Sequence, residues 1–209
     1  MKVTLLDYGV NNILNVYRAF EYLEISVSIT NCPSKIKEAG HLVLPGVGAF
    51  DKGMSSLQKL NLIDSLMYHS KAGKPLLGIC LGMQMLMDSS EEFGWHEGLG
   101  LVSGSNRPIT ATARRKNTHI GWSEVEPNSG SVGWDDTIFS DIASKTPMYF
   151  VHSFVATPND NKNLLAITDY DGLKINAAIG KDNIVGCQFH PEKSGAMGLK
   201  VLNNFMKLN

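Results

Sequence analysis

The chain has 209 residues, of which 43% are hydrophobic and 19% are charged, and its formal net charge is -1. This length and composition are typical of a globular protein with one sizeable core, so we expect a single domain over residues 1–209. The near-neutral charge provides no basic field for nucleic acid, and no apolar run reaches the ~20 residues of a membrane helix. Because no secretory signal pattern opens the sequence, we expect a cytoplasmic protein without nucleic-acid or membrane partners.

The three cysteines, Cys32, Cys80 and Cys187, are odd in number and widely spaced. No Cys-x-x-Cys pair or Cys/His cluster predicts a disulfide framework or a zinc site. No Gly-x-Gly-x-x-Gly or phosphate-loop motif occurs either. We therefore expect free thiols, no metal and no cofactor, and the setting of each cysteine decides its role.

The first ninety residues alternate between strand and helix patterns. Four short apolar runs have the length and composition of strands: residues 2–7, 27–30, 41–44 and 75–80. Three segments repeat apolar residues with helical spacing: residues 13–23, 57–68 and 81–87. Such alternation predicts parallel strands with helices on both faces of the sheet.

The second half of the chain changes to strand patterns joined by short turns, with a hairpin signal at Asp171-Gly172. The predicted strands cover residues 122–125, 148–155, 164–169, 176–179 and 184–189. An apolar stripe from Leu199 to Met206 predicts a closing helix. The expected fold class is α/β, with a mostly parallel central sheet, helices on both faces and an antiparallel addition in the C-terminal half.

The sequence Gly-Ile-Cys-Leu-Gly at residues 78–82 lies where a buried strand meets a helix. Glycines two positions before and after Cys80 permit the sharp turn that exposes a nucleophile above the edge of a sheet. The helix N-terminus favours negative charge on the thiol, and the Leu81 N–H is available to an oxyanion. A buried, inert cysteine is the alternative interpretation of this segment alone.

Residues 188–194 follow a late strand and contain a candidate base. His190 stands at the strand end, and Glu192 is close enough in a tight turn to orient the imidazole. Together with Cys80, these residues predict a Cys-His-Glu triad. A second turn, Pro-Gly-Val-Gly at residues 45–48, ends a strand in the same half of the sheet, and its glycines allow the Val47 peptide to turn an N–H into the site.

These motifs together resemble the class I glutamine amidotransferases, and the resemblance runs almost end to end. Further segments carry it: 7–9, Asn12, 45–48, 78–84, 119–122, 149–152 and 188–194. Within that family, the chain is similar to the glutaminase subunits of imidazole glycerol phosphate synthases, which serve histidine biosynthesis. The turn at 45–48 and the His-x-Gly-Trp stretch at 119–122 distinguish this subfamily from related glutaminases.

The resemblance assigns roles by position, with Cys80 as the nucleophile, His190 as the base and Glu192 as the orienting acid. It implies an oxyanion site at Val47, Gly48 and Leu81. It implies glutamine-binding residues at Gly46, Gln84, Glu92, His152, Ser153 and Phe154. It implies that a partner protein contacts Asn12, His119, Trp122, Tyr149 and Lys193.

The implied reaction is hydrolysis of glutamine to glutamate and ammonia. Free ammonia would be protonated and lost in water, so a partner must receive it by a closed path. The resemblance implies a (β/α)₈ barrel cyclase as the obligate acceptor in a heterodimer, which uses the ammonia to make imidazole glycerol phosphate. We expect the Val47 peptide to point away from the site until this partner binds, with low activity in isolation.

Two positions depart from the family pattern, and both lie toward the expected partner side. Asn11 stands where glycine is usual, and Thr118 stands in a segment that usually contains proline. They leave open a paralogous glutaminase that supplies ammonia to a sugar-amidinating synthase of surface polysaccharide. A cysteine hydrolase or chaperone-like relative is opposed by Gln84 and Glu92. A non-catalytic binding subunit is opposed by the complete triad.

Overall fold

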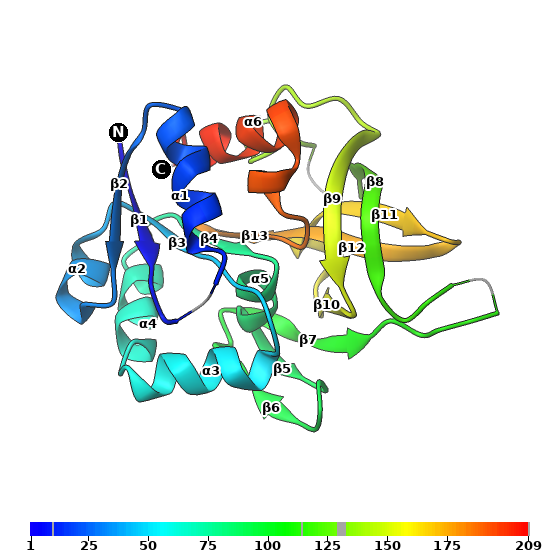
Figure 1. Cartoon of the computed structure of the whole chain (residues 1–209), viewed down its shortest axis with the longest axis horizontal. Helices are drawn as coiled ribbons and strands as arrows, with labels where there is room; N and C mark the ends of the chain where they lie inside the picture. Colours follow the sequence, from blue (N-terminus) through cyan, green and yellow to red (C-terminus); the bar gives the residue numbers. More distant parts are fainter. Residues whose placement is uncertain (10, 114, 129–132, 209) are drawn as a thin grey trace.

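A computed structural model describes residues 1–9, 11–113, 115–128 and 133–208. Its centre is a nine-stranded sheet (Figure 1). The strand order across this sheet is β2 (Ser26–Thr30), β1 (Lys2–Leu6), β3 (His41–Leu44), β4 (Leu76–Ile79), β13 (Ile184–Cys187), β12 (Leu173–Lys181), β11 (Leu164–Tyr170), β8 (His119–Pro127) and β9 (Thr146–His152).

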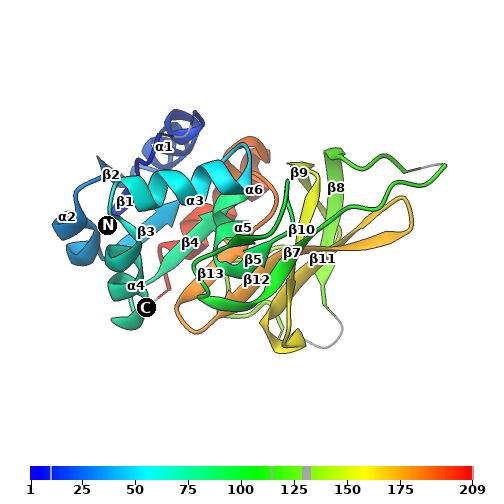
Figure 2. The same cartoon turned by 90° about the horizontal axis from the view of Figure 1, so that it is seen from below.

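The sheet has a parallel half and an antiparallel half. Strands β2, β1, β3, β4 and β13 pair in parallel, and every pairing from β13 to β9 is antiparallel. Figure 2 shows the parallel strands at the end that holds the N-terminus and β8, β9 and β11 at the other end. This arrangement confirms the expected α/β class with an antiparallel addition.

Helices cover both faces of the parallel half. Helices α1 (Ile13–Tyr22) and α6 (Gly195–Phe205) lie on one face, and α3 (Phe50–Lys59), α4 (Ile63–Lys71) and α5 (Leu81–Met85) lie on the other (Figure 1). The short α2 (Pro33–Glu38) packs against α4. Strand side chains alternate between the two resulting cores, so Val43 joins one and Leu42 and Leu44 join the other.

A second, four-stranded sheet lies beside α5. Its strand order is β10 (Phe154–Pro158), β7 (Val102–Pro108), β5 (Met87–Ser90) and β6 (His96–Glu97). Two short 3-10 helices complete the described elements: η1 (Asn161–Asn163) and η2 (Pro191–Lys193). None of the helices in the described residues is long and apolar enough to cross a membrane.

Two predicted elements are divided in the structure. The helical segment 57–68 belongs to two helices, because Asn61 has a φ of 54° and ends the first in the left-handed region that asparagine tolerates. The predicted strand 148–155 breaks at Ser153 into β9 of the large sheet and β10 of the small one. This break brings residues 151–154 to the junction between the sheets, where they line a pocket together with Cys80.

Candidate active site

Cys80 occupies the strained turn between β4 and α5. Its φ of 53° and ψ of -107° are unusual for a residue with a side chain, and such strain is typical of functional sites. The glycines on either side permit the turn: a Cβ at Gly78 would lie 2.7 Å from the Met83 nitrogen, and one at Gly82 would collide with the Leu44 carbonyl oxygen. The sequence therefore holds the Cys80 thiol at the carboxyl edge of the parallel strands.

His190 follows β13, the strand next to β4, and faces the same edge. Its Nδ1 lies 2.8 Å from Glu192 Oε1, and both side chains are completely buried. Burial alone would lower the pKa of His190, but the nearby Cys80 sulfur and Glu192 carboxylate raise it to about 10. A cationic imidazole favours the thiolate form of a neighbouring cysteine.

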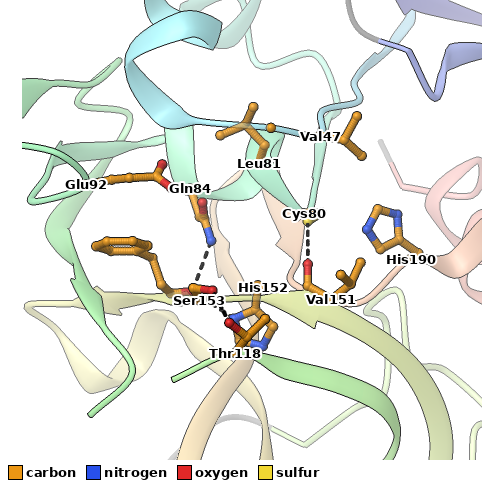
Figure 3. Close-up of a pocket in the computed structure, with 12 residues that line it drawn as sticks. Val47, Cys80, Leu81, Gln84, Glu92, Thr118, Val151, His152, Ser153 and His190 are labelled. Carbon is orange, nitrogen blue, oxygen red and sulfur yellow. Dashed lines mark hydrogen bonds between the residues drawn. The ribbon is translucent and has the colours of Figure 1, made fainter. Parts of the chain in front are cut away.

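The Nε2 of His190 is buried and has no hydrogen-bond partner among the described residues. Figure 3 shows this ring turned toward the side of the pocket that holds Cys80. The Cys80 thiol makes long contacts, 3.8 Å to Val151 O and 3.7 Å from Gln188 Nε2, and also interacts with the His190 imidazole. The thiol and the imidazole therefore face the same space, where a ligand can reach both.

A cavity of about 260 Å³ opens over Cys80. Ten of the residues that the sequence singled out line it together: Val47, Gly48, Cys80, Leu81, Gln84, Glu92, His152, Ser153, Phe154 and His190. Gly46 is not among the lining residues, and Glu192 lies behind His190. These ten residues come from five separate parts of the chain and meet around one thiol. Figure 3 shows their side chains around the Cys80 sulfur.

Gln84 is fixed by hydrogen bonds from its amide nitrogen. Nε2 donates to Phe154 O and to Gln188 Oε1, each at 3.0 Å. Gln84 therefore presents its side-chain oxygen to a ligand. Glu92 is held in a similar way, because its Oε2 accepts from the Phe50 backbone N–H at 2.6 Å.

Three contributors to the site were not predicted from the sequence. Thr118 and Val151 line the cavity, and the Thr118 and Ser153 hydroxyl oxygens are 2.8 Å apart. Gln188 is fully buried and connects Gln84 with the Cys80 sulfur. A polar residue at the end of an otherwise apolar buried strand was the available signal for Gln188.

The structure corrects the expectation of a free Leu81 N–H. That group donates to Gly46 O at 3.3 Å. A trans peptide places its N–H opposite its carbonyl oxygen, so the Val47 N–H points away from Leu81. The preceding carbonyl, Pro45 O, accepts from the Tyr8 hydroxyl. In the described conformation the Leu81 N–H predicted for an oxyanion is therefore occupied by the protein's own backbone.

The five residues assigned to a partner contact separate into two groups. Trp122 is 57% exposed and meets Tyr149 edge-on, with ring centroids 5.9 Å apart. Lys193 Nζ lies 5.8 Å from the Tyr149 ring centroid, so these three side chains form one surface cluster.

Asn12 and His119 depart from that expectation. Their exposed fractions are 6% and 1%, so neither side chain is available to a partner in this structure. His119 points inward because strand residues alternate, and its neighbours Ile120 and Trp122 take exposed positions on β8. The buried amide of Asn12 has no hydrogen-bond partner among the described residues.

Comparisons with known proteins show the family of the chain. The model of the family described as glutamine amidotransferase class-I matches residues 4–208. The imidazole glycerol phosphate synthase subunit HisH 1 of Legionella pneumophila (strain Lens) is 47% identical over 210 residues, with 99% of each chain covered. The subunit HisH of Lactococcus lactis subsp. lactis (strain IL1403) is 41% identical over 206 residues, covering 99% of this chain and 98% of that one.

Solved structures show the same fold at lower identity. The structure of PurLQS from Thermotoga maritima matches with a TM-score of 0.76 and 18% identity, covering 99% of this chain and 97% of that chain. The crystal structure of a glutamine amidotransferase from Thermotoga maritima gives a TM-score of 0.61 at 20% identity, with 99% and 82% covered. The family match and the full-length identities show that this chain belongs to the class I glutamine amidotransferases, enzymes that hydrolyse glutamine.

Proposed function

We propose that the chain is the glutaminase subunit of an imidazole glycerol phosphate synthase and supplies ammonia for histidine biosynthesis. The observation that carries this proposal is the strained Cys80 turn, which faces the buried His190–Glu192 pair across a cavity of about 260 Å³. The full-length likeness to HisH subunits supports the choice of pathway.

In the proposed mechanism, the Cys80 thiolate attacks the side-chain carbonyl carbon of glutamine. His190 donates its Nε2 proton to the departing ammonia, which leaves a glutamyl thioester on Cys80. Neutral His190 then removes a proton from water as the water attacks the thioester, and glutamate and the thiolate are released. Glu192 holds the imidazole through Nδ1 and stabilises its positive charge in both steps.

The oxyanion needs donors that the described conformation withholds. Rotation of the peptide between Gly46 and Val47 would free the Leu81 N–H and turn the Val47 N–H into the site. This rotation changes ψ of Gly46 and φ of Val47, and Gly46, without a side chain, can adopt the required ψ. We propose that partner binding stabilises the rotated peptide, so that the isolated chain hydrolyses glutamine slowly.

The remaining lining residues fit the substrate's polar end. The Gln84 side-chain oxygen and the Glu92 carboxylate suit the α-amino group of glutamine. The backbone of residues 152–154 forms the wall opposite Cys80. We also propose that residues 1–209 are one glutamine amidotransferase domain, in keeping with the family match to residues 4–208.

The proposed acceptor is a (β/α)₈ barrel cyclase that docks over the cluster of Trp122, Tyr149 and Lys193. The exposed Trp122, packed on the half-buried Tyr149 beside the cation of Lys193, is a common kind of interface anchor. We place the reaction in the cytoplasm, because the free thiols of Cys32, Cys80 and Cys187 suit a reducing compartment.

The test measures glutamate release by the purified chain alone, with the histidine-pathway cyclase, and with the cyclase and its nucleotide ligand. We expect strong stimulation by the cyclase and its loss in Cys80→Ala. If the cyclase leaves glutamate release unchanged, the partner is a sugar-amidinating synthase rather than the histidine-pathway cyclase. If the chain releases no glutamate with either synthase, the result contradicts the proposed enzyme and favours a non-catalytic binding subunit.

A further inference from the structure

Two buried histidines lie opposite each other on β8 and β9: His152 lines the pocket, and His119 lies behind it. His119 and His152 are register partners, and His119 Nδ1 lies 3.1 Å from His152 Nε2. His119 Nε2 lies 2.8 Å from the Ser123 hydroxyl, and His152 Nδ1 lies 2.8 Å from Phe154 O. These contacts form a continuous hydrogen-bonded chain from β8 to the pocket-lining segment.

The donor and acceptor in every hydrogen bond of this chain follow from its final acceptor, Phe154 O. A carbonyl oxygen can only accept, so His152 Nδ1 carries the proton donated to Phe154 O. Burial lowers the pKa of His152 to about 3 and that of His119 to about 4, so both rings are neutral near pH 7. His152 Nε2 must then accept from the His119 Nδ1–H, and His119 Nε2 must accept from the Ser123 hydroxyl.

A second chain of hydrogen bonds meets the first at Phe154 O. This oxygen also accepts from Gln84 Nε2, which in turn donates to Gln188 Oε1. Gln188 Nε2 is 3.7 Å from the Cys80 sulfur. The position of one carbonyl oxygen therefore depends on the histidine pair behind it and fixes Gln84 in front of it.

The contacts of His119 hold its imidazole ring in one orientation. Its ring is stacked between Phe150 and Tyr170, at centroid distances of 4.6 Å and 4.3 Å. It is 1% exposed and does not line the cavity, so it touches no substrate. A side chain held on both ring faces and at both nitrogens is well suited to position its neighbours.

We propose that His119 is a positioning residue for glutamine binding, acting through His152 and the Phe154 carbonyl on Gln84. Without the His119 donor, the buried His152 Nε2 lacks a partner, and the segment 152–154 is free to shift. Such a shift weakens the binding of glutamine before chemistry begins. This inference rests on the proposed function, since it takes glutamine as the substrate.

The test compares His119→Phe, which keeps the stacked ring and removes both nitrogens, with His119→Asn, whose amide N–H replaces the Nδ1–H. Ser123→Ala, which keeps the His119–His152 bond, is the matched control. Each variant is assayed in complex with the cyclase for the kcat and KM of glutamate release. Glutamine binding to the same variants in a Cys80→Ala background is measured by calorimetry.

We expect His119→Phe to raise KM and the dissociation constant about 10-fold, equivalent to about 1.4 kcal/mol, with kcat changed less than about threefold. His119→Asn should restore both constants to within about threefold of the parent, and Ser123→Ala should stay close to it. Loss of correctly folded protein alone would lower kcat and leave KM unchanged. If His119→Phe does not fold, His119→Asn is compared with His119→Ala. The proposal is wrong if these two variants bind glutamine equally tightly.

Two results would overturn the inference. Equal KM values in the parent and His119→Phe complexes would remove the positioning role and leave the proposed function intact. Absence of both binding and hydrolysis of glutamine in the unsubstituted complex would remove the proposed function and this inference with it.

Discussion

In the parallel half of the large sheet, Cys80 and His190 stand at the ends of neighbouring strands, and backbone geometry places them. In the antiparallel half, His119 and His152 face each other across β8 and β9, and side-chain hydrogen bonds place the pocket wall. One half therefore presents the reacting groups, whereas the other half shapes the space beside them. Substitutions in the first should lower kcat, and substitutions in the second should raise KM.

The buried histidines show the same difference electrostatically. The pKa of His190 is raised to about 10, because Cys80 and Glu192 outweigh the effect of burial. The pKa values of His119 and His152 are lowered to about 4 and about 3, because burial dominates where no carboxylate is paired with the ring. A charged histidine serves proton transfer, and neutral histidines serve as directional donors and acceptors.

Removal of the proposed nucleophile should give the largest effect. Cys80→Ala should lower kcat by more than about 10³-fold, because no other described thiol lines the pocket. Glutamate release by the cyclase complex measures this effect, and Cys32→Ala is the control, since Cys32 stands before α2 and does not line the pocket. Equal losses in the two variants would contradict the assignment of Cys80.

The next effect concerns the backbone that holds Cys80. Gly82→Ala would drive a Cβ into the Leu44 carbonyl group, whose carbon would lie 2.9 Å away. Because backbone atoms cannot move aside easily, we expect a loss of about 3 kcal/mol in the free energy of unfolding. Denaturant unfolding should show little change in Gly40→Ala, where nothing lies within 4 Å of the added Cβ. Similar stabilities would mean that α5 can retreat from β3.

The same contrast explains what the sequence could predict. The parallel half follows local rules: apolar strands, glycines around a turn and helical periodicity predict β3, β4, α5 and the place of Cys80. The antiparallel half depends on pairings between distant residues. The break at Ser153 has no local signal, because the apolar pattern continues from β9 into β10 although the two strands join different sheets.

Burial was the least predictable property of the site. His119 and Trp122 belong to one sequence motif. Because side chains along a strand alternate in direction, the His119 ring points inward and the Trp122 ring points outward. Which face is covered depends on Phe150 and Tyr170, from two other strands. Likewise, the blocked Leu81 N–H depends on Gly46, far away in sequence. Motifs therefore predicted the residues of the site more readily than their contacts.

The lowered pKa values predict a loss of stability in acid. An unfolded histidine gains a proton near pH 6.5, whereas folded His119 and His152 resist protonation until about pH 4 and about pH 3. The unfolded chain therefore binds more protons below pH 6.5, and the free energy of unfolding falls as the pH falls toward 4. Each histidine contributes a slope of at most about 1.4 kcal/mol per pH unit.

Urea unfolding between pH 7 and pH 4 measures this slope. His119→Asn removes one titrating ring and should have a shallower acid dependence than the parent protein. Ser123→Ala disturbs the same chain of hydrogen bonds and keeps both rings, so its slope should match the parent. A steep parent-like slope in His119→Asn would mean that other groups dominate in acid.

The smallest effect should come from Thr118, at the outer end of the pocket wall. Its hydroxyl is 2.8 Å from the Ser153 hydroxyl, and both residues are half-buried at the cavity. Thr118→Val keeps the shape of the side chain and removes this partner, but water can reach Ser153 in its place. We therefore expect KM for glutamine to rise about two- to fivefold, less than for His119→Phe, with kcat unchanged. Lys116→Ala, at an exposed position two residues away, is the control and should behave like the parent, whereas the Asn117 side chain is unsuitable because its Oδ1 accepts from the Thr118 hydroxyl at 3.4 Å. A rise larger than that of His119→Phe would mean that the hydroxyl pair at the pocket mouth, rather than the buried histidine pair, sets the position of the glutamine-binding wall.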